Sequence, residues 1–321
     1  MRRLLAIASC LLVAATGGAA NAPDIFLADS LRQLGLAPLA RVAGDPAFSE
    51  RLGAKGLPTF FAEANKDYLL VEGLKIYLDD PIGQLRGKLT VTRIDYDKVI
   101  VPLAWRLPAP RPGAQRILLD PGHGGKDPGK VHTTLNYTEK AATLDTALRL
   151  KPLLEKQGFE VWLTRDKDVA IDLEDRAPMA TKAKADLFLS LHYNGGAAGD
   201  TTSSGIETYC LTPTGQHSTN KAAGRADLTA EPGNKLDTFN LQLAFNVHRQ
   251  LLAQTGAEDR GIRRARFAVL RPLTCPGILI EGGFVSSRVE GAQIANAAYR
   301  QKLAQAIADG VLDYARALRA K

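Results

Sequence analysis

The 321-residue chain has an ordinary globular composition: 45% of its residues are hydrophobic, enough for a sizeable core, and 23% are charged. Its formal net charge of +7 and its pI of about 9.3 favour anionic partners. The sequence nevertheless contains no dense Lys/Arg run and no basic patch interleaved with aromatic residues, which excludes nucleic acid from the expected partners.

The N-terminal residues 1–22 have the pattern of a secretory signal peptide. Two arginines precede an apolar run over residues 4–15, and small residues follow the run as far as Ala22. The run is shorter than the roughly 20 apolar residues that cross a membrane. We therefore expect an extracytoplasmic protein, periplasmic or secreted after signal-peptide cleavage, without stable membrane insertion. A lipid on Cys10 and an uncleaved buried helix are the alternatives.

Residues 23–105 are expected to form a small N-terminal α+β accessory domain. A short helical pattern surrounds residues 30–34. Alternating apolar residues predict three strands, over residues 68–71, 74–78 and 88–91. The proline-rich segment 106–115 predicts an extended linker, so the part that follows it is expected to fold on its own.

Residues 116–321 alternate between strand and helix patterns, which predicts an α/β domain. We expect a mixed, mainly parallel sheet flanked by helices, a phosphorylase/hydrolase-like fold. Apolar runs predict strands over residues 117–119, 161–163, 186–191, 206–211, 267–270 and 278–280. Helical spacing predicts helices over residues 139–157, 173–184, 237–255 and 297–318. The polar segment 212–234 predicts a long surface loop.

Four chemically capable side chains fall at one edge of the predicted sheet. His123 follows the first strand in a glycine-rich turn, His192 ends the third strand, and Glu281 ends a late one. Glu139 opens the helix after the turn. Ligands of open α/β sheets bind beyond the carboxyl ends of the strands. Two imidazoles and one carboxylate are a typical catalytic zinc set, and a second carboxylate can transfer protons. The pattern therefore predicts a catalytic Zn²⁺ site.

The remaining histidines and cysteines are not assigned to this site. We expect His132, His217 and His248 to lie in loops or on a helix surface, away from the metal. Outside the leader, the chain contains Cys210 and Cys275. An oxidising compartment permits a disulfide between them, and two buried free thiols are the alternative.

Four ordered motifs carry a family resemblance. They are residues 119–125 (LDPGHGG), 139–140 (EK), 185–192 (ADLFLSLH) and 280–286 (IEGGFVS). With them, residues 117–318 resemble the zinc-dependent N-acetylmuramoyl-L-alanine amidases, which are cell-wall amidases. The resemblance implies zinc ligands at His123, Glu139 and His192 and a catalytic carboxylate at Glu281. It also implies hydrolysis of the amide bond between N-acetylmuramic acid and L-alanine in bacterial peptidoglycan.

Peptidoglycan is thus the expected partner, and a protein activator is left open as a second one. Residues 71–78 resemble a copper-amine-oxidase-like accessory module, without implying a copper site. Two alternatives to the amidase interpretation stay open. One is a different zinc hydrolase, such as a carboxypeptidase acting on the stem peptide. The other is a non-catalytic protein that binds the wall or activates an enzyme.

Overall fold

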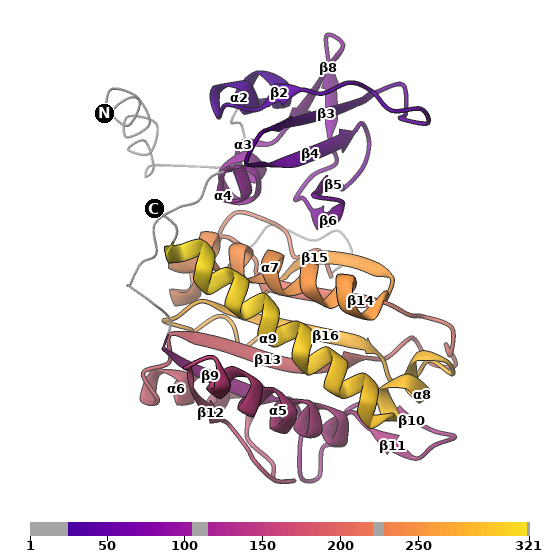
Figure 1. Ribbon diagram of the computed structural model, residues 1–321, viewed down its shortest axis with the longest axis vertical. Helices are drawn as coiled ribbons and strands as arrows, with labels where there is room; N and C mark the ends of the chain where they lie inside the picture. The colour runs from indigo at the N-terminus through magenta and orange to yellow at the C-terminus, as the bar shows by residue number, and fades with distance from the viewer. Residues whose placement is uncertain (1–24, 105–114, 221–227, 320–321) are drawn as a thin grey trace.

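An 11-stranded sheet forms the framework of the molecule (Figure 1). The structure, a computed structural model, describes residues 25–104, 115–220 and 228–319. The expected signal peptide and most of the expected linker lie outside the described residues. Among the described helices, none is long and apolar enough to cross a membrane. The strands follow one another in the order β12-β9-β13-β16-β14-β15-β6-β5-β4-β3-β2.

The C-terminal part of the chain supplies six strands of this sheet. They are β9 (Arg116–Pro121), β12 (Glu160–Leu163), β13 (Leu187–Asn194), β14 (Ile206–Leu211), β15 (Asp259–Ala265) and β16 (Gly277–Phe284). β12, β9, β13 and β16 are parallel neighbours, whereas β14 runs antiparallel to β16 and parallel to β15. This arrangement confirms the mixed, mainly parallel sheet predicted from the strand–helix alternation.

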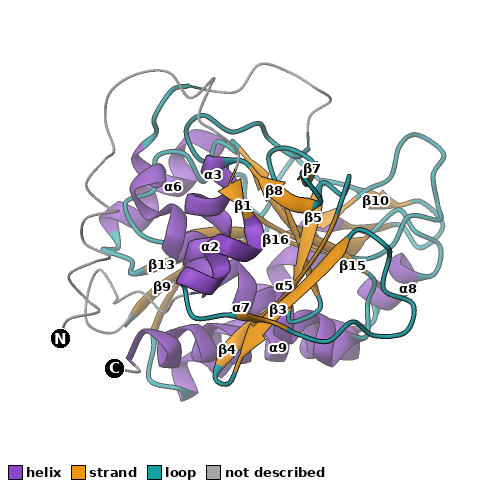
Figure 2. Cartoon of the chain, turned by 90° about the horizontal axis from the view of Figure 1, so that it is seen from above, coloured by secondary structure: helices purple, strands orange, loops and turns teal. Residues whose placement is uncertain are grey.

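Helices cover both faces of these six strands (Figure 2). One face carries α5 (Glu139–Lys156), α7 (Asp237–Thr255) and α9 (Ala297–Arg319), and the other carries α6 (Leu173–Lys182). The short helix α8 (Glu290–Ala295) follows β16. α7 ends where Gly256 adopts the left-handed conformation, with φ of 69°, that glycine takes without strain. The four helices predicted in the C-terminal part are confirmed to within two residues at each end.

The N-terminal part contains short strands and helices. They are β1 (Ile25–Phe26), α2 (Leu27–Gln33), β2 (Ala37–Pro38), β3 (Ser49–Ala54), β4 (Leu57–Glu63), β5 (Tyr68–Val71), β6 (Leu74–Tyr77), β7 (Gly83–Leu85), β8 (Lys88–Val91), α3 (Arg93–Asp95), the π-helix η2 (Tyr96–Ile100) and α4 (Val101–Ala104). β2 to β6 form an antiparallel meander, while β1, β8 and β7 form a separate small sheet.

The two parts share the large sheet. β6 runs parallel to β15, with Ile76 opposite Ile262, and Lys75 N donates to Asp259 Oδ2 at 2.9 Å. Side chains from both parts also belong to one hydrophobic core. Further polar contacts join Gln216 to Asp95, His217 to Asp79, Lys98 to Asp237 and Gln242 to Pro102. The N-terminal strands therefore extend the C-terminal sheet directly.

One predicted strand is wrong. Phe267 has no regular structure and residues 268–270 form a turn, whereas the strand in this region is β15, earlier in the chain. Val269 and Leu270 are nevertheless buried in a hydrophobic cluster, and the ring of the partly buried Phe267 lies 5.1 Å from that of Tyr209. An apolar run of four residues indicates burial without fixing the backbone conformation.

The predicted long loop and the two cysteines can also be compared with the structure. Within the segment 212–234, the described residues include the 3-10 helix η3 (Pro232–Leu236) and otherwise lack helix and strand. Cys210 and Cys275 are both buried free thiols, so the structure selects the second of the two alternatives. The hairpin of β10 (Val131–His132) and β11 (Tyr137–Thr138) leads directly into α5.

Candidate metal centre

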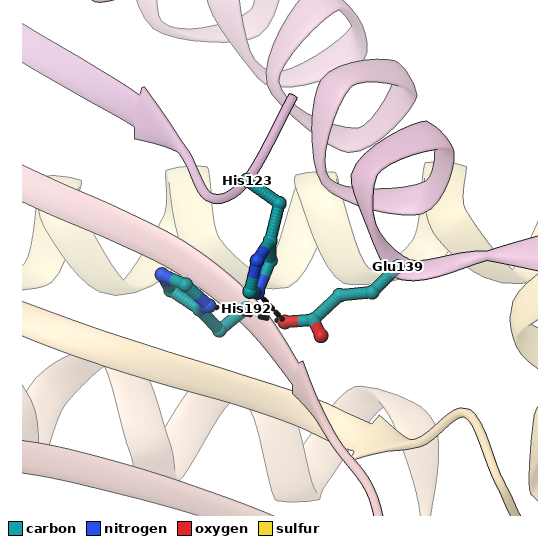
Figure 3. Close-up of side chains that lie close together, drawn as sticks. All are labelled: His123, Glu139 and His192. Carbon is teal, nitrogen blue, oxygen red and sulfur yellow. Dashed lines mark hydrogen bonds and ion pairs between the residues drawn. The ribbon is translucent and has the colours of Figure 1, made fainter. Parts of the chain in front are cut away.

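Three side chains converge at the edge where β9 and β13 end (Figure 3). His123 lies two residues beyond β9, Glu139 is the first residue of α5, and His192 lies near the end of β13. Their donor atoms all lie within 4.8 Å of one another. Glu139 Oε1 is 3.0 Å from both His123 Nε2 and His192 Nδ1. Among the described residues, this is the one such group of histidine, cysteine and acidic side chains.

Glycines allow the side chains of the donor group to approach each other so closely. A Cβ at Gly122 would lie 2.2 Å from His192 Cε1, and one at Gly129 would lie 2.5 Å from Glu139 Oε2. Both distances are too short for real contacts, so larger residues at these positions would displace His192 or Glu139. His123 itself has φ of 61°, a left-handed conformation that costs a non-glycine residue energy.

Two buried arginines hold the turn in this conformation. Arg176 pairs with the fully buried Asp120 at 2.7 Å and donates to the His123 carbonyl at 2.9 Å. Arg165 donates to the Gly122 carbonyl at 2.8 Å. Charge-assisted hydrogen bonds of this kind are stronger than neutral ones and compensate the strain of the turn. Arg165 and Arg176 are not among the site residues predicted from the sequence.

Asp127 orients one of the imidazoles and was missed by the sequence reasoning. Its Oδ2 lies 2.7 Å from His123 Nδ1, and this contact turns the imidazole so that Nε2 faces Glu139 Oε1 at 3.0 Å. Carboxylates that bind the second nitrogen of a histidine commonly fix the tautomer of a metal ligand. The only signal in the sequence is an acidic residue four positions after His123.

The site is electrostatically arranged around Glu139. Burial raises the pKa of this carboxyl, but hydrogen bonds and charge from His123 and His192 outweigh it and lower the pKa overall. Conversely, burial lowers the pKa of His123, and Glu139 and Asp127 more than compensate and raise it. Backbone N–H groups of Lys130 and Tyr193 also donate to Glu139, at 2.8 and 3.1 Å. A buried carboxylate between two imidazoles is the nitrogen and oxygen donor set that fits Zn²⁺.

Glu281 lies on the neighbouring strand β16, beside the donor group but outside it. In register it faces His192 on β13 and Glu207 on β14. Its Oε2 is buried and has no hydrogen-bond partner among the described residues. Burial, together with the charges of Glu139 and Glu207, raises the pKa of Glu281 well above its ordinary value. An unpaired buried carboxyl group is costly and points to a functional role.

Glu207 differs from Glu281 because an arginine and two neutral donors bind its carboxylate. Arg260 Nε donates to Glu207 Oε1 at 2.8 Å, and the Tyr209 hydroxyl and Asn194 amide donate to Oε2 at 2.7 and 3.0 Å. These contacts outweigh burial and lower the pKa of Glu207. Of the two facing glutamates, Glu281 is the one available for proton transfer.

The other histidines lie elsewhere. His132 is buried in the strand β10, so its expected position in a loop or on a helix surface was wrong, and His217 contacts Asp79 in the N-terminal part. His248 is fully buried in α7, where Thr208 and Asp259 bind its two ring nitrogens, so the expected helix-surface position was wrong for this residue.

Comparisons with known proteins identify the family of the C-terminal part. Residues 117–313 match the protein family described as N-acetylmuramoyl-L-alanine amidase. The N-acetylmuramoyl-L-alanine amidase LytC of Bacillus subtilis is 34% identical over 203 residues, which are 63% of this chain and 36% of LytC. AmiA of Escherichia coli, of the same description, is 31% identical over 226 residues, covering 63% of this chain and 76% of AmiA. The chain thus matches about a third of LytC.

Solved structures show the same fold. The N-acetylmuramoyl-L-alanine amidase of Clostridium difficile 630 is 34% identical with a TM-score of 0.52, covering 63% of this chain and 97% of that one. AmiC2 of Nostoc punctiforme is 29% identical with a TM-score of 0.53, covering 64% and 99%. The C-terminal part is therefore an α/β amidase domain. The chain belongs to the N-acetylmuramoyl-L-alanine amidase family.

Proposed function

We propose that this protein is a zinc-dependent hydrolase that cleaves the amide bond between N-acetylmuramic acid and L-alanine in bacterial peptidoglycan. One observation carries the proposal: the His123–Glu139–His192 donor group lies beside the unpaired carboxyl of Glu281. The family match over residues 117–313 and the names of the relatives support the substrate.

The donor group would hold the Zn²⁺ ion. His123 and His192 offer nitrogen, Glu139 offers oxygen, and three protein ligands are typical of a catalytic zinc. Zinc bound there would supply Lewis acidity for a water molecule and for the substrate carbonyl. Asp127 would keep His123 in the tautomer that binds metal, and the buried Arg165 and Arg176 would keep the turn in place.

Glu281 would move the proton. Its carboxylate accepts a proton from the attacking water, whose oxygen forms a bond to the lactyl carbonyl carbon. The same carboxyl group then donates that proton to the amide nitrogen as the carbon–nitrogen bond breaks, which releases the free amino group of L-alanine. The position of Glu281 next to His192 in the sheet, outside the donor group, suits this role.

Digestion of purified peptidoglycan tests the proposal. The expected products are stem peptides with a new L-alanine amino terminus and glycan strands without new reducing ends. A carboxypeptidase would instead release amino acids from the carboxyl end of the stem peptide. A non-catalytic wall-binding protein would bind the material and leave no new ends, and either of these two results would overturn the proposal.

The remaining proposals concern location and organisation. We propose action outside the cytoplasm, with residues 1–22 as a signal peptide, 23–105 as an accessory domain, 106–115 as a linker and 116–321 as the catalytic domain. A protein activator is a further proposed partner. One structure of the same fold is CwlD of Clostridioides difficile in complex with the GerS lipoprotein, and its 24% identity shows the fold alone.

A further inference from the structure

Lys130 stands at the rim of the metal centre with an unpaired positive charge. The residue is exposed, and its ammonium group has no hydrogen bond or ion pair with any described residue. Most other charged groups around the site are already balanced. Glu207 is paired with Arg260, and Glu139 is shared between two imidazoles. Lys130 is therefore a free cation beside the reacting groups.

The backbone of Lys130 is fixed to a ligating residue. Lys130 N donates to Glu139 Oε2 at 2.8 Å, and Glu139 N donates to the Lys130 carbonyl at 2.7 Å. These two hydrogen bonds hold the lysine at a set position relative to the metal centre. Its place is thus defined by the site, unlike that of a lysine on a mobile surface loop.

The side chain of Lys130 is directed across the rim by a glycine. A Cβ at Gly195, directly after β13, would lie 2.6 Å from Lys130 Cδ and 3.0 Å from Cε, so the aliphatic part of the lysine lies against the bare glycine backbone. The charge of Lys130 also reaches Glu281, whose raised pKa it partly offsets. The backbone of Lys130 is thus bonded to Glu139, and its aliphatic side chain lies against Gly195, three residues after His192.

We propose that Lys130 binds a free carboxylate in the peptide portion of the substrate and makes the enzyme selective for stem peptides that carry one close to the cleaved amide. This inference rests on the proposed function. An ammonium group is a compact donor for a carboxylate, and a charge-assisted hydrogen bond contributes more than a neutral one. A substrate whose carboxylates are converted to amides loses that contact while keeping its shape.

The test measures kcat and KM of the zinc-loaded full-length protein on two matched muropeptides, one with free and one with amidated stem carboxylates. We expect wild type to prefer the free acid by about 10- to 100-fold in kcat/KM, through KM. Lys130→Ala should lower this preference to near unity, and Lys130→Arg should retain most of it. Lys126→Ala, an exposed lysine of the same loop, is the control and should behave like wild type.

A second variant tests the geometry. Gly195→Ala has an ordinary backbone conformation but displaces the lysine side chain, so it should reduce the preference in the same direction. Equal cleavage of both muropeptides by wild type, or an unchanged preference in Lys130→Ala, would overturn the inference and leave the amidase proposal standing. Failure of wild type to cleave either muropeptide would overturn the amidase proposal and the inference together.

Discussion

The two parts of the shared sheet carry different kinds of residues. In the C-terminal part, parallel strands end at one edge and place His192 and Glu281 side by side. In the N-terminal part, β2 to β6 form an antiparallel meander that contributes no residue to the donor group. Its β6 instead pairs with β15, two strands away from β16. The C-terminal part positions the donor group and Glu281. The N-terminal part covers the edge of β15 and contributes side chains to the shared core.

Removal of the N-terminal part should have the largest effect. A chain that begins at Gly113 would expose the edge of β15 and would lose Ile76, Leu78 and Leu103 from the shared core. Each buried side chain of this size contributes about 1.5–3 kcal/mol. We expect a loss of several kcal/mol in the free energy of unfolding, measured by urea titration. A chain lacking only residues 1–22 is the control, and equal midpoints for both would show that the parts are independent.

The junction should also respond to pH through Asp95. This fully buried carboxyl accepts hydrogen bonds from Gln216 Nε2 and Thr92 Oγ1, and burial raises its pKa from 3.8 to about 6. Between pH 3.8 and about 6, Asp95 keeps its proton in the folded protein but has lost it in the unfolded chain. The free energy of unfolding therefore falls as pH rises. Relative to Asp95→Asn, wild type should lose about 2 kcal/mol between pH 4 and 6.5. Parallel pH curves would contradict this.

Within the C-terminal part, the second interaction of His123 can be weakened selectively. Asp127→Asn removes the negative charge next to Nδ1 while keeping the size of the side chain. We expect zinc affinity to fall by about 10- to 100-fold, as for other carboxylates that orient a histidine ligand. Asp166→Asn changes an exposed acid outside the site and should bind zinc as wild type does. Competition with a chelator measures both, and equal affinities would remove Asp127 from the site.

The smallest expected effect lies at the contact of Tyr77 with Arg263. Arg263 Nη2 donates to the Tyr77 hydroxyl at 3.0 Å, and its guanidinium lies 4.1 Å from the ring centroid. Tyr77→Phe keeps the ring and loses the hydrogen bond, so we expect a loss of about 1 kcal/mol in the free energy of unfolding. The hydroxyl of Tyr68 has no hydrogen bond among the described residues, so Tyr68→Phe should change stability less. An equal loss of stability in both variants would show that the hydrogen bond from Arg263 does not account for the effect.

The site residues at the ends of strands could be predicted from the sequence because local patterns of apolar residues determine where strands end. His123, His192 and Glu281 each follow or end an apolar run, and parallel strands bring such positions to one edge. Glu139 was predicted because it begins a long helical pattern. The structure places three of these residues within one donor group and the fourth on the next strand.

The pairing of distant strands and the contacts of loops could not be predicted from the sequence. The Ile76–Ile262 pair joins strands far apart in the chain, and no periodicity signals which edge strand will meet which. β15 was missed because its sequence, Asp259–Ala265, contains three arginines and lacks an apolar run, although its partners on both sides make it a strand. Asp127 lies in a turn whose conformation depends on buried Arg165 and Arg176.

The central claim is that ligand and base are separate groups at this site, and the metal content and turnover of Glu281→Gln test it most directly. Glutamine keeps the shape of the side chain but cannot accept the proton. We expect the variant to bind zinc like wild type and to lose about 10²- to 10⁴-fold in turnover on peptidoglycan. His192→Ala, measured beside it, should lose zinc as well as activity. A zinc-free Glu281→Gln protein would make Glu281 a ligand, and a fully active one would contradict its role as the base.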